Sequence, residues 1–257
     1  MDLDFDAALQ RGDLVSAASL IERGADVNRV WATTEQVERD TYDETKTYLR
    51  QAALGDEPEV VRFLLEHGAD PNVAGIYSGE TALLGAARYG HTKVVDLLLA
   101  HGADVSVVDT RTHWSVLDYA VCGVHVPTLR SLLAAGARPR LERLNFSIQG
   151  GAAAREVIRL LVENGADINA IDGWGRTPLM WAAEHAEVDT VRLMMDLGAD
   201  VKRVSEPNSN GWQSYETALG AARKANRKEV AALLQAAGAK VDPRSESLLD
   251  RLKNLLG

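Results

Sequence analysis

The phrase Gly-Ala-Asp, or a close variant of it, recurs seven times along the 257-residue chain. It begins at Gly24, Gly68, Gly102, Gly165 and Gly198, and as Gly-Ala-Arg or Gly-Ala-Lys at Gly136 and Gly238. Successive occurrences lie 44, 34, 34, 29, 33 and 40 residues apart. This spacing indicates a stack of similar units, because a unit of this size cannot bury its apolar face alone.

Each phrase follows an apolar run with helical spacing, such as VVRFLLEH from Val60 and VVDLLLAH from Val94. The glycine can adopt the left-handed conformation that ends a helix. Upstream lies a shorter, alanine-rich run, such as TALLGAA from Thr81 and TPLMWAA from Thr177. Its Thr or Ser can accept hydrogen bonds from the first free backbone N–H groups. The repeat is therefore predicted to be a pair of helices.

The segment DGWGRTPLMWAA, residues 172–183, closely matches the ankyrin phrase D-x-x-G-x-T-P-L-H-x-A-A. On these residues the chain resembles an ankyrin-repeat protein from end to end. The resemblance implies an all-α solenoid of stacked helix pairs, with hairpin-like fingers projecting to one side. It also implies a single domain, residues 1–257, with units ending near residues 28, 72, 106, 139, 169, 202 and 241.

The two ends of the chain are expected to cap the stack, because a terminal repeat would otherwise expose apolar surface. The first unit begins abruptly at residues 2–10. At the other end, residues 245–256 carry leucines on one helical face, so we expect a capping helix there. A membrane-surface helix is the alternative, but its polar face mixes acidic and basic residues.

The repeats differ most in their fingers. From the phrase glycine to the next Thr or Ser, three fingers measure 13, 13 and 12 residues, whereas those at residues 29–46 and 203–216 measure 23 and 19. The first long finger is locally acidic, and Thr34 can cap a short helix over residues 33–40; disorder is the alternative.

The fifth unit is short, and its first helix, residues 144–152, has lost the threonine start. Its glycines indicate a local kink or, alternatively, a hinge.

Aromatic residues concentrate in the fingers or at their feet, and amphipathic aromatics are typical of interface hot spots. The residues after the alanine pair of each first helix are expected to line a concave groove. Together these positions, with acidic residues of the first long finger, form the predicted partner-binding set. The set is Trp31, Glu35, Glu38, Tyr42, Asp43, Tyr77, Arg88, Tyr89, Arg111, His113, Trp114, Trp174, Glu184, His185, Trp212 and Tyr215.

No motif of catalysis or metal binding is present. The chain has no phosphate-binding glycine loop, no nucleophile elbow and no H-E-x-x-H. With Cys122 as the only cysteine, neither an intramolecular disulfide nor a cysteine-built zinc site is possible. Glu184 and His185 are adjacent on a helix and are not expected to face each other. We therefore predict no enzyme, no cofactor and no metal.

The net charge of −9 argues against nucleic acid and favours a basic partner protein. No apolar run is long enough to span a bilayer and no signal peptide is evident, so we expect a cytoplasmic monomer. The sequence predicts a non-catalytic protein-interaction module that uses its fingers and groove. Two alternatives stay open: an inhibitor or immunity-type protein that masks a basic enzyme or toxin, and an enzyme or small-ligand binder with a pocket between a long finger and the first helices.

Overall fold

The computed structural model describes residues 2–37, 40–75, 78–139, 151–208, 210–211, 214–242 and 244, without the side chains of residues 2, 3 and 32–45. The chain divides into two compact units, Met1–Arg138 and Pro139–Gly257. Several predictions fall outside the described residues. These are the capping helix at 245–256, most of the first helix expected at 144–152, and the candidates Glu38, Tyr77 and Trp212.

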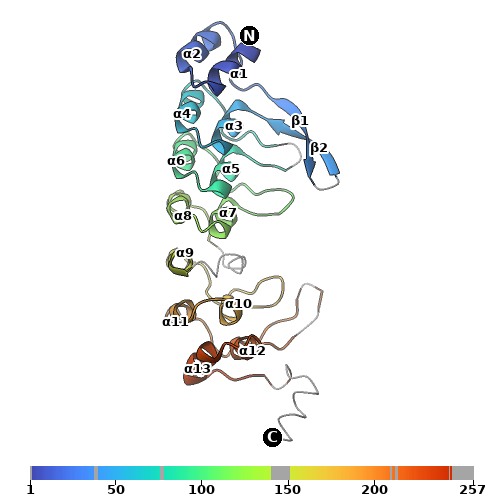
Figure 1. Cartoon of the computed structure of the whole chain (residues 1–257), viewed down its shortest axis with the longest axis vertical. Helices are drawn as coiled ribbons and strands as arrows, with labels where there is room; N and C mark the ends of the chain where they lie inside the picture. The colour runs from blue at the N-terminus through green and yellow to red at the C-terminus, as the bar shows by residue number, and fades with distance from the viewer. Residues whose placement is uncertain are drawn as a thin grey trace, which may run out of the picture. The chain divides into compact units, whose positions relative to one another are not determined.

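The first unit contains four helix pairs and one two-stranded sheet. Its elements are α1 (Asp2–Gln10), α2 (Leu14–Glu22), β1 (Trp31–Val37), β2 (Asp40–Lys46), α3 (Tyr48–Leu54), α4 (Pro58–Glu66), α5 (Ala82–Tyr89), α6 (Thr92–Ala100), α7 (Val116–Cys122) and α8 (Val126–Ala134). The first helices stack in the order α3, α5, α7, and the second helices in the order α4, α6, α8 (Figure 1).

The second unit repeats this arrangement. Its elements are α9 (Gly151–Glu163), α10 (Pro178–His185), α11 (Val188–Asp196), α12 (Ala218–Lys224) and α13 (Lys228–Ala236). First helix α10 packs on α12, and second helix α11 packs on both α9 and α13. One boundary differs from the prediction. Helix α9 already begins at Gly151, so residues 151–152 belong to the second helix of the fifth repeat, not to its first helix.

The predicted helix caps are confirmed at five first helices. The hydroxyl of each cap residue accepts a hydrogen bond from the backbone N–H three residues later. The five residues are Thr47, Thr81, Ser115, Thr177 and Thr217. The Ser115 backbone N–H also donates to the Asp118 carboxylate, which completes a capping box. These caps fix where each of these five fingers ends.

Small and branched residues share the core of the stack. Ala86 and Ala87 of α5 are fully buried, as are Leu83 and Leu84 of the same helix. Leu98 of α6 is also fully buried. Alanine lets neighbouring helices approach closely, while leucine fills the space between layers. The all-α helix-pair fold expected from the sequence is therefore confirmed, with one hairpin added to it.

That hairpin corrects the expectation of a short helix over residues 33–40. The first long finger forms antiparallel strands β1 and β2, which pair from Trp31↔Lys46 to Val37↔Asp40. In Figure 1 it projects on the same side as the other fingers of the first unit. The segment contains four threonines and a valine within the two strands, and β-branched residues favour an extended pleated backbone.

Asparagine side chains connect successive repeats. The Asn28 amide donates to the Gly68 carbonyl (2.8 Å) and accepts from the Asp70 backbone N–H (2.8 Å). Asn72 makes the same pair of bonds to Gly102 and Asp104, and Asn169 to Gly198 and Asp200. Each amide therefore joins its own finger to the start of the next one. We call this arrangement the asparagine clamp.

Candidate functional site

In the first unit, the feet of the fingers meet in a charged cluster. Glu80 pairs with Arg50 and also with Arg88, whose Nη1 lies 2.9 Å from its carboxylate. Arg88 donates to the Tyr119 hydroxyl (2.8 Å), and its Cζ lies 4.4 Å from the centre of that ring. Tyr119 in turn donates to Asp109 (2.7 Å). We call these five residues the first-unit cluster.

The carboxylate of Asp109 is buried but well satisfied. Besides the Tyr119 hydroxyl, it accepts the backbone N–H groups of Arg111 and Thr112. Burial alone would raise the pKa of Asp109, but these hydrogen bonds and the charge of Arg88 hold it below its usual value. Burial, together with the bond to Asp109, raises the pKa of Tyr119, so the hydroxyl keeps its proton at neutral pH.

A second cluster occupies the same place in the second unit. The Trp181 indole N–H donates to Asp172 (2.6 Å), and the Arg176 guanidinium lies over the indole ring. Arg176 also pairs with Glu184 (2.6 Å) and Glu216 (2.8 Å). These five residues form the second-unit cluster. It holds three carboxylates against one guanidinium, so its charge is negative.

The two clusters share one design. Asp109 lies six residues before the cap Ser115, and Asp172 lies five before Thr177. The aromatic partner stands four residues after the cap in both cases. In each unit a finger carboxylate binds the polar edge of a first-helix aromatic, while an arginine covers its face. The arrangement ties each of these two fingers to its own first helix.

Residues at the turns between paired helices also fix the first helices. The His91 imidazole reaches the Leu54 carbonyl (3.3 Å), and that of His125 reaches the Arg88 carbonyl (3.1 Å). At the equivalent place in the second unit, Arg227 donates to the Glu184 carbonyl (3.1 Å). The end of each of these helices is therefore held by the next repeat.

Two of the predicted aromatic residues are exposed. Trp174, in the finger before α10, exposes 65% of its surface, and Tyr89, at the end of α5, exposes 56%. Trp174 stands on a firmly bonded turn, because the Asp172 carboxylate accepts the backbone N–H groups of both Trp174 and Arg176 (2.9 Å each). An exposed indole on a rigid turn is suited to contact another molecule.

Three other predicted aromatics pack against neighbours. The Trp31 ring lies 4.8 Å from that of Tyr48, and Trp114 lies 5.1 Å from Tyr119. Tyr215 lies beneath the Arg244 guanidinium. Arg111 is exposed and contributes its backbone N–H to Asp109. For Glu35, Tyr42 and Asp43 the structure describes the hairpin backbone but not the side chains.

His113 and Tyr215 occupy a special backbone position. Both lie two residues before the cap and have positive φ, 56° and 52°. The equivalent residues in two other fingers are Gly79 and Gly175, also with positive φ. A Cβ on Gly175 would lie 1.9 Å from the Glu206 carbonyl oxygen of the next finger, so only glycine fits there. His113 is exposed at its equivalent position.

Glu184 and His185 approach each other more closely than expected for sequence neighbours. The His185 Nε2 lies 3.7 Å from the Glu184 carboxylate, and its ring stacks on Trp181. The Glu184 carboxylate is also bound by Arg176. The pair thus belongs to the rim of the second-unit cluster.

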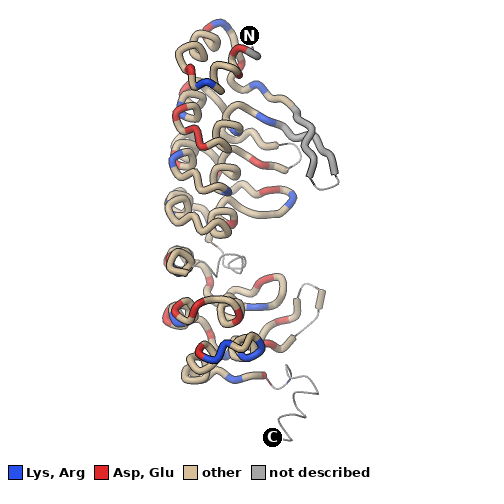
Figure 2. The backbone as a smooth tube through the Cα atoms, viewed as in Figure 1, with Lys and Arg blue, Asp and Glu red and all other residues tan. Residues whose placement is uncertain are grey.

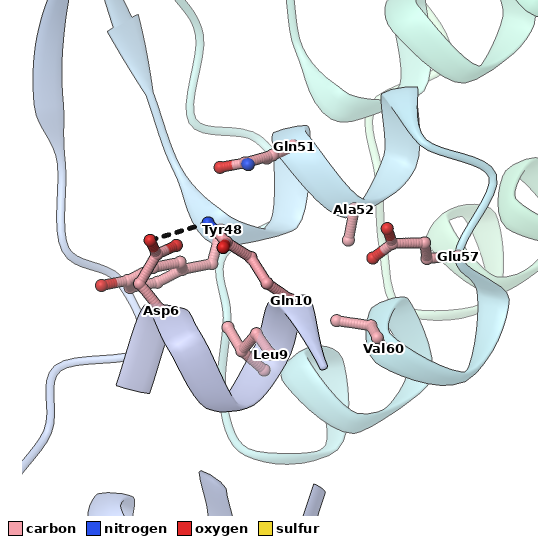
Figure 3. Close-up of a pocket in the computed structure, with 8 residues that line it drawn as sticks. All are labelled: Asp6, Leu9, Gln10, Tyr48, Gln51, Ala52, Glu57 and Val60. Atoms are coloured by element: carbon pink, nitrogen blue, oxygen red, sulfur yellow. Dashed lines mark hydrogen bonds between the residues drawn. The ribbon is translucent and has the colours of Figure 1, made fainter. Parts of the chain in front are cut away.

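A shallow pocket lies between α1, α3 and α4 (Figure 3). Its empty volume is about 300 Å³, part of it open to solvent, and its floor includes Leu9 and Val60. On the rim, Gln10 donates to Asp6 (2.9 Å). The lining contains neither His113 nor His185. Among the described residues, no group of three or more His, Cys, Asp or Glu is arranged to hold a metal ion.

No helix within the described ranges is both long enough and apolar enough to cross a bilayer.

Sequence reasoning missed several members of both clusters: Arg50, Glu80, Asp109, Tyr119, Asp172, Arg176, Trp181 and Glu216. A signal was present, because an aspartate five or six residues before the cap is matched by an aromatic four residues after it. The predicted Arg88 and Glu184 do belong to the clusters.

The fold and its finger surface define a class of protein, the helix-pair repeat scaffold. A family model described as ankyrin repeats, in three copies, matches residues 49–143 and again residues 144–245. The chain belongs to the ankyrin-repeat family. Ankyrin repeats are generally protein-interaction modules, and their fold is typically non-catalytic.

Individual relatives agree with this assignment. The probable E3 ubiquitin-protein ligase XBOS32 of Oryza sativa subsp. japonica is 32% identical over 197 residues, which cover 76% of this chain and 38% of that protein. The human ASB11 ankyrin repeat domain aligns with a TM-score of 0.66 and 26% identity, over 90% of this chain and 96% of that domain. The Bcl-3 ankyrin repeat domain shows the same fold, with a TM-score of 0.63 and 24% identity, over 82% of this chain and 99% of that domain.

Proposed function

We propose that this chain is a non-catalytic module that binds a partner protein through its fingers and the adjoining face of its first helices. The observation that carries the proposal is Trp174, which exposes 65% of its surface on a turn fixed by Asp172. Binding immobilises little at such a site, because the backbone is already ordered. Tyr89, exposed on the first unit, is a second contact residue.

The partner is basic at its point of contact. The second-unit cluster carries surplus negative charge, since the guanidinium of Arg176 pairs with both Glu184 and Glu216 and the carboxylate of Asp172 adds a third negative charge. Trp174 lies two residues from Asp172, so an arginine or lysine of the partner can pair with the carboxylates and contact the indole face. A narrower form of this proposal is an inhibitor that masks a basic enzyme or toxin.

The first long finger supplies further specificity. Residues 29–46 carry five acidic residues, Glu35, Glu38, Asp40, Asp43 and Glu44, against the three basic residues Arg29, Arg39 and Lys46. We further propose that residues 1–257 act as one repeat domain, and that the protein is a cytoplasmic monomer that engages neither nucleic acid nor membrane. The net charge of −9 supports the last two points.

The test is a pull-down from the native host with mass spectrometry, followed by binding measurements on variants. Trp174→Ala should weaken the partner's affinity by about thirtyfold, as loss of a hot-spot residue does. Val15→Ala is the matched control, because Val15 is 85% exposed on α2. Equal affinity of the Trp174→Ala variant and the wild type would refute the proposal.

The hairpin finger can be tested separately. Ala32 and Thr45 are paired across the strands, so replacing residues 33–44 with Asn-Gly closes the hairpin with a two-residue turn. Trp31 and its packing on Tyr48 are then retained. We expect an unchanged unfolding transition and lost or weakened partner binding. Full retention of binding would remove the finger from the interface.

A further inference from the structure

A basic turn joins α12 to α13 in an otherwise acidic chain. Arg223 and Lys224 end α12, and Arg227 and Lys228 begin α13, so four cations occur within six residues. Figure 2 shows them as a blue run between the two helices. The net charge of the whole chain is −9, which makes a concentration of positive charge here a local exception. We call these four residues the basic turn.

The charges of the basic turn are not neutralised. Arg223, Lys224 and Lys228 are exposed, and none of them pairs with a carboxylate within the part of the chain that the structure describes. Arg227 donates to the backbone carbonyls of Glu184 and Ala186, so its guanidinium binds neutral groups. The turn therefore presents net positive charge to solvent.

Favourable interaction with the helix ends explains only two of the four cations. Arg223 and Lys224 lie in the last turn of α12, where cations favourably meet the partial negative charge of the helix end. Arg227 and Lys228 lie at the N-cap and first position of α13, where a cation is unfavourable.

The other second helices that have a described N-cap avoid this arrangement. They place Asp13, Glu57, His91, His125 and Glu187 at the N-cap and no Lys or Arg at the first position. Among these second helices, α13 alone therefore carries two cations at its N-terminus, where positive charge is unfavourable.

The turn is also a fixed platform. Asn226 adopts positive φ (57°), and the Arg227 backbone N–H donates to the Ala222 carbonyl (2.8 Å). The Arg227 side chain then anchors the turn to the end of α10 through the Glu184 carbonyl. Because the backbone of the turn is already ordered, binding loses less conformational entropy here than it would on a mobile loop with the same four cations.

From these observations we infer that the basic turn binds an acidic peptide segment of a partner protein. A short segment fits better than an extended polyanion, because Glu229 and the ion-paired Glu184 and Glu187 border the turn, and no further cations extend the positive charge beyond these three glutamates in the described segments next to the turn. The long-range field of the acidic chain likewise disfavours nucleic acid and anionic membranes. This surface is opposite in charge to the Trp174 surface, although Glu184 lies at the edge of both, so the inference does not depend on the proposed function.

The test measures binding of a fluorescein-labelled deca-glutamate peptide to the full chain by fluorescence anisotropy. We expect binding that weakens with added salt, and a loss of at least about tenfold in the Arg223→Glu/Lys224→Glu/Lys228→Glu variant. Lys228→Glu alone should weaken peptide binding. Its melting temperature should be equal to or higher than that of the wild type, because an acidic residue is favourable at the start of α13. A purely structural role for Lys228 would lower the melting temperature.

Controls separate the turn from general charge. Lys93→Glu makes the same charge change at an exposed position of α6 and should leave peptide binding intact. Trp174→Ala should also leave it intact, which separates this inference from the proposed function. The inference is overturned if the wild type does not bind the peptide, or if the triple variant binds it as well as the wild type.

Competing occupants give distinct outcomes. Tighter binding of oligothymidylate or of phosphatidylserine vesicles than of the peptide, lost in the triple variant, would assign the turn to a different anion and overturn the inference. The chain could also self-associate through the basic turn. If sedimentation velocity shows self-association that the triple variant abolishes, the turn binds a second copy of the chain and the inference is overturned.

Discussion

The Cζ of the Arg176 guanidinium lies 3.9 Å from the centre of the Trp181 indole ring. The same ring donates its N–H to the Asp172 carboxylate. One aromatic residue therefore links a finger to a first helix through both its face and its edge. Tyr119 makes the equivalent two contacts with Arg88 and Asp109 in the first unit.

Trp181→Phe tests the edge contact. Phenylalanine keeps an aromatic face beneath Arg176 but cannot donate to Asp172. A hydrogen bond to a charged group contributes about 1.5–3 kcal/mol, so we expect the free energy of unfolding to fall by about that amount in urea titrations. Trp174→Phe is the control, because Trp174 is exposed and its replacement should change stability by less than about 0.5 kcal/mol. Equal stabilities of the two variants would contradict the prediction.

Asp109→Asn tests the first-unit cluster through its pH dependence. The folded-state pKa of Asp109 lies below its usual 3.8, so its carboxylate stabilises the fold above about pH 3.8. That contribution is lost as the pH falls through the folded pKa. The variant should thus be less stable than the wild type at pH 7, and the difference in unfolding free energy should shrink below about pH 4. A difference that stays constant from pH 7 to pH 3 would contradict this expectation.

Val124→Gly should stabilise the first unit. Val124 has φ of 55°, a left-handed conformation that a β-branched residue adopts only at a cost. The equivalent turns hold Gly90 and Asn226. Removing the strain should raise the unfolding free energy by about 1 kcal/mol, measured by thermal or urea unfolding. Val121→Gly, within helix α7, is the control and should destabilise.

Asn72→Ala tests the asparagine clamp. The variant loses two hydrogen bonds to the next finger, at 3.1 Å and 2.8 Å. Each exposed bond contributes about 0.5–1.5 kcal/mol, so the unfolding free energy should fall by about 1–3 kcal/mol. Ser106→Ala is the matched control, because the Ser106 hydroxyl donates to Asp104 of its own finger (2.7 Å). If both variants lose equal stability, the clamp contributes nothing beyond the finger itself.

The parts of the fold that depend on local chemistry could be predicted from the sequence. Thr81 and Thr177 cap helices where predicted, because a hydroxyl three residues before a free N–H needs no tertiary partner. Gly68 and Gly102 end helices with φ of 86° and 84° for the same local reason. Such features repeat in register, so a single chain shows them several times.

The parts that depend on contacts distant in sequence could not be predicted. Arg50 pairs with Glu80 across 30 residues, and no periodic pattern indicates that contact. The hairpin was missed for another reason: Thr34 can cap a helix, but across the finger it pairs with Asp43 on the opposite strand. Cross-strand pairing and β-branched residues outweighed the local helix signal there.

The asparagine clamp has a consequence for how such a chain can diverge. Each amide binds only main-chain atoms of the following finger, the carbonyl of a glycine and the N–H of an aspartate. A neighbouring finger can therefore change nearly all of its side chains without losing its attachment. The attachment between repeats is therefore compatible with varied surface chemistry, and a gene duplication that copies one repeat would produce a new repeat already able to join its neighbours.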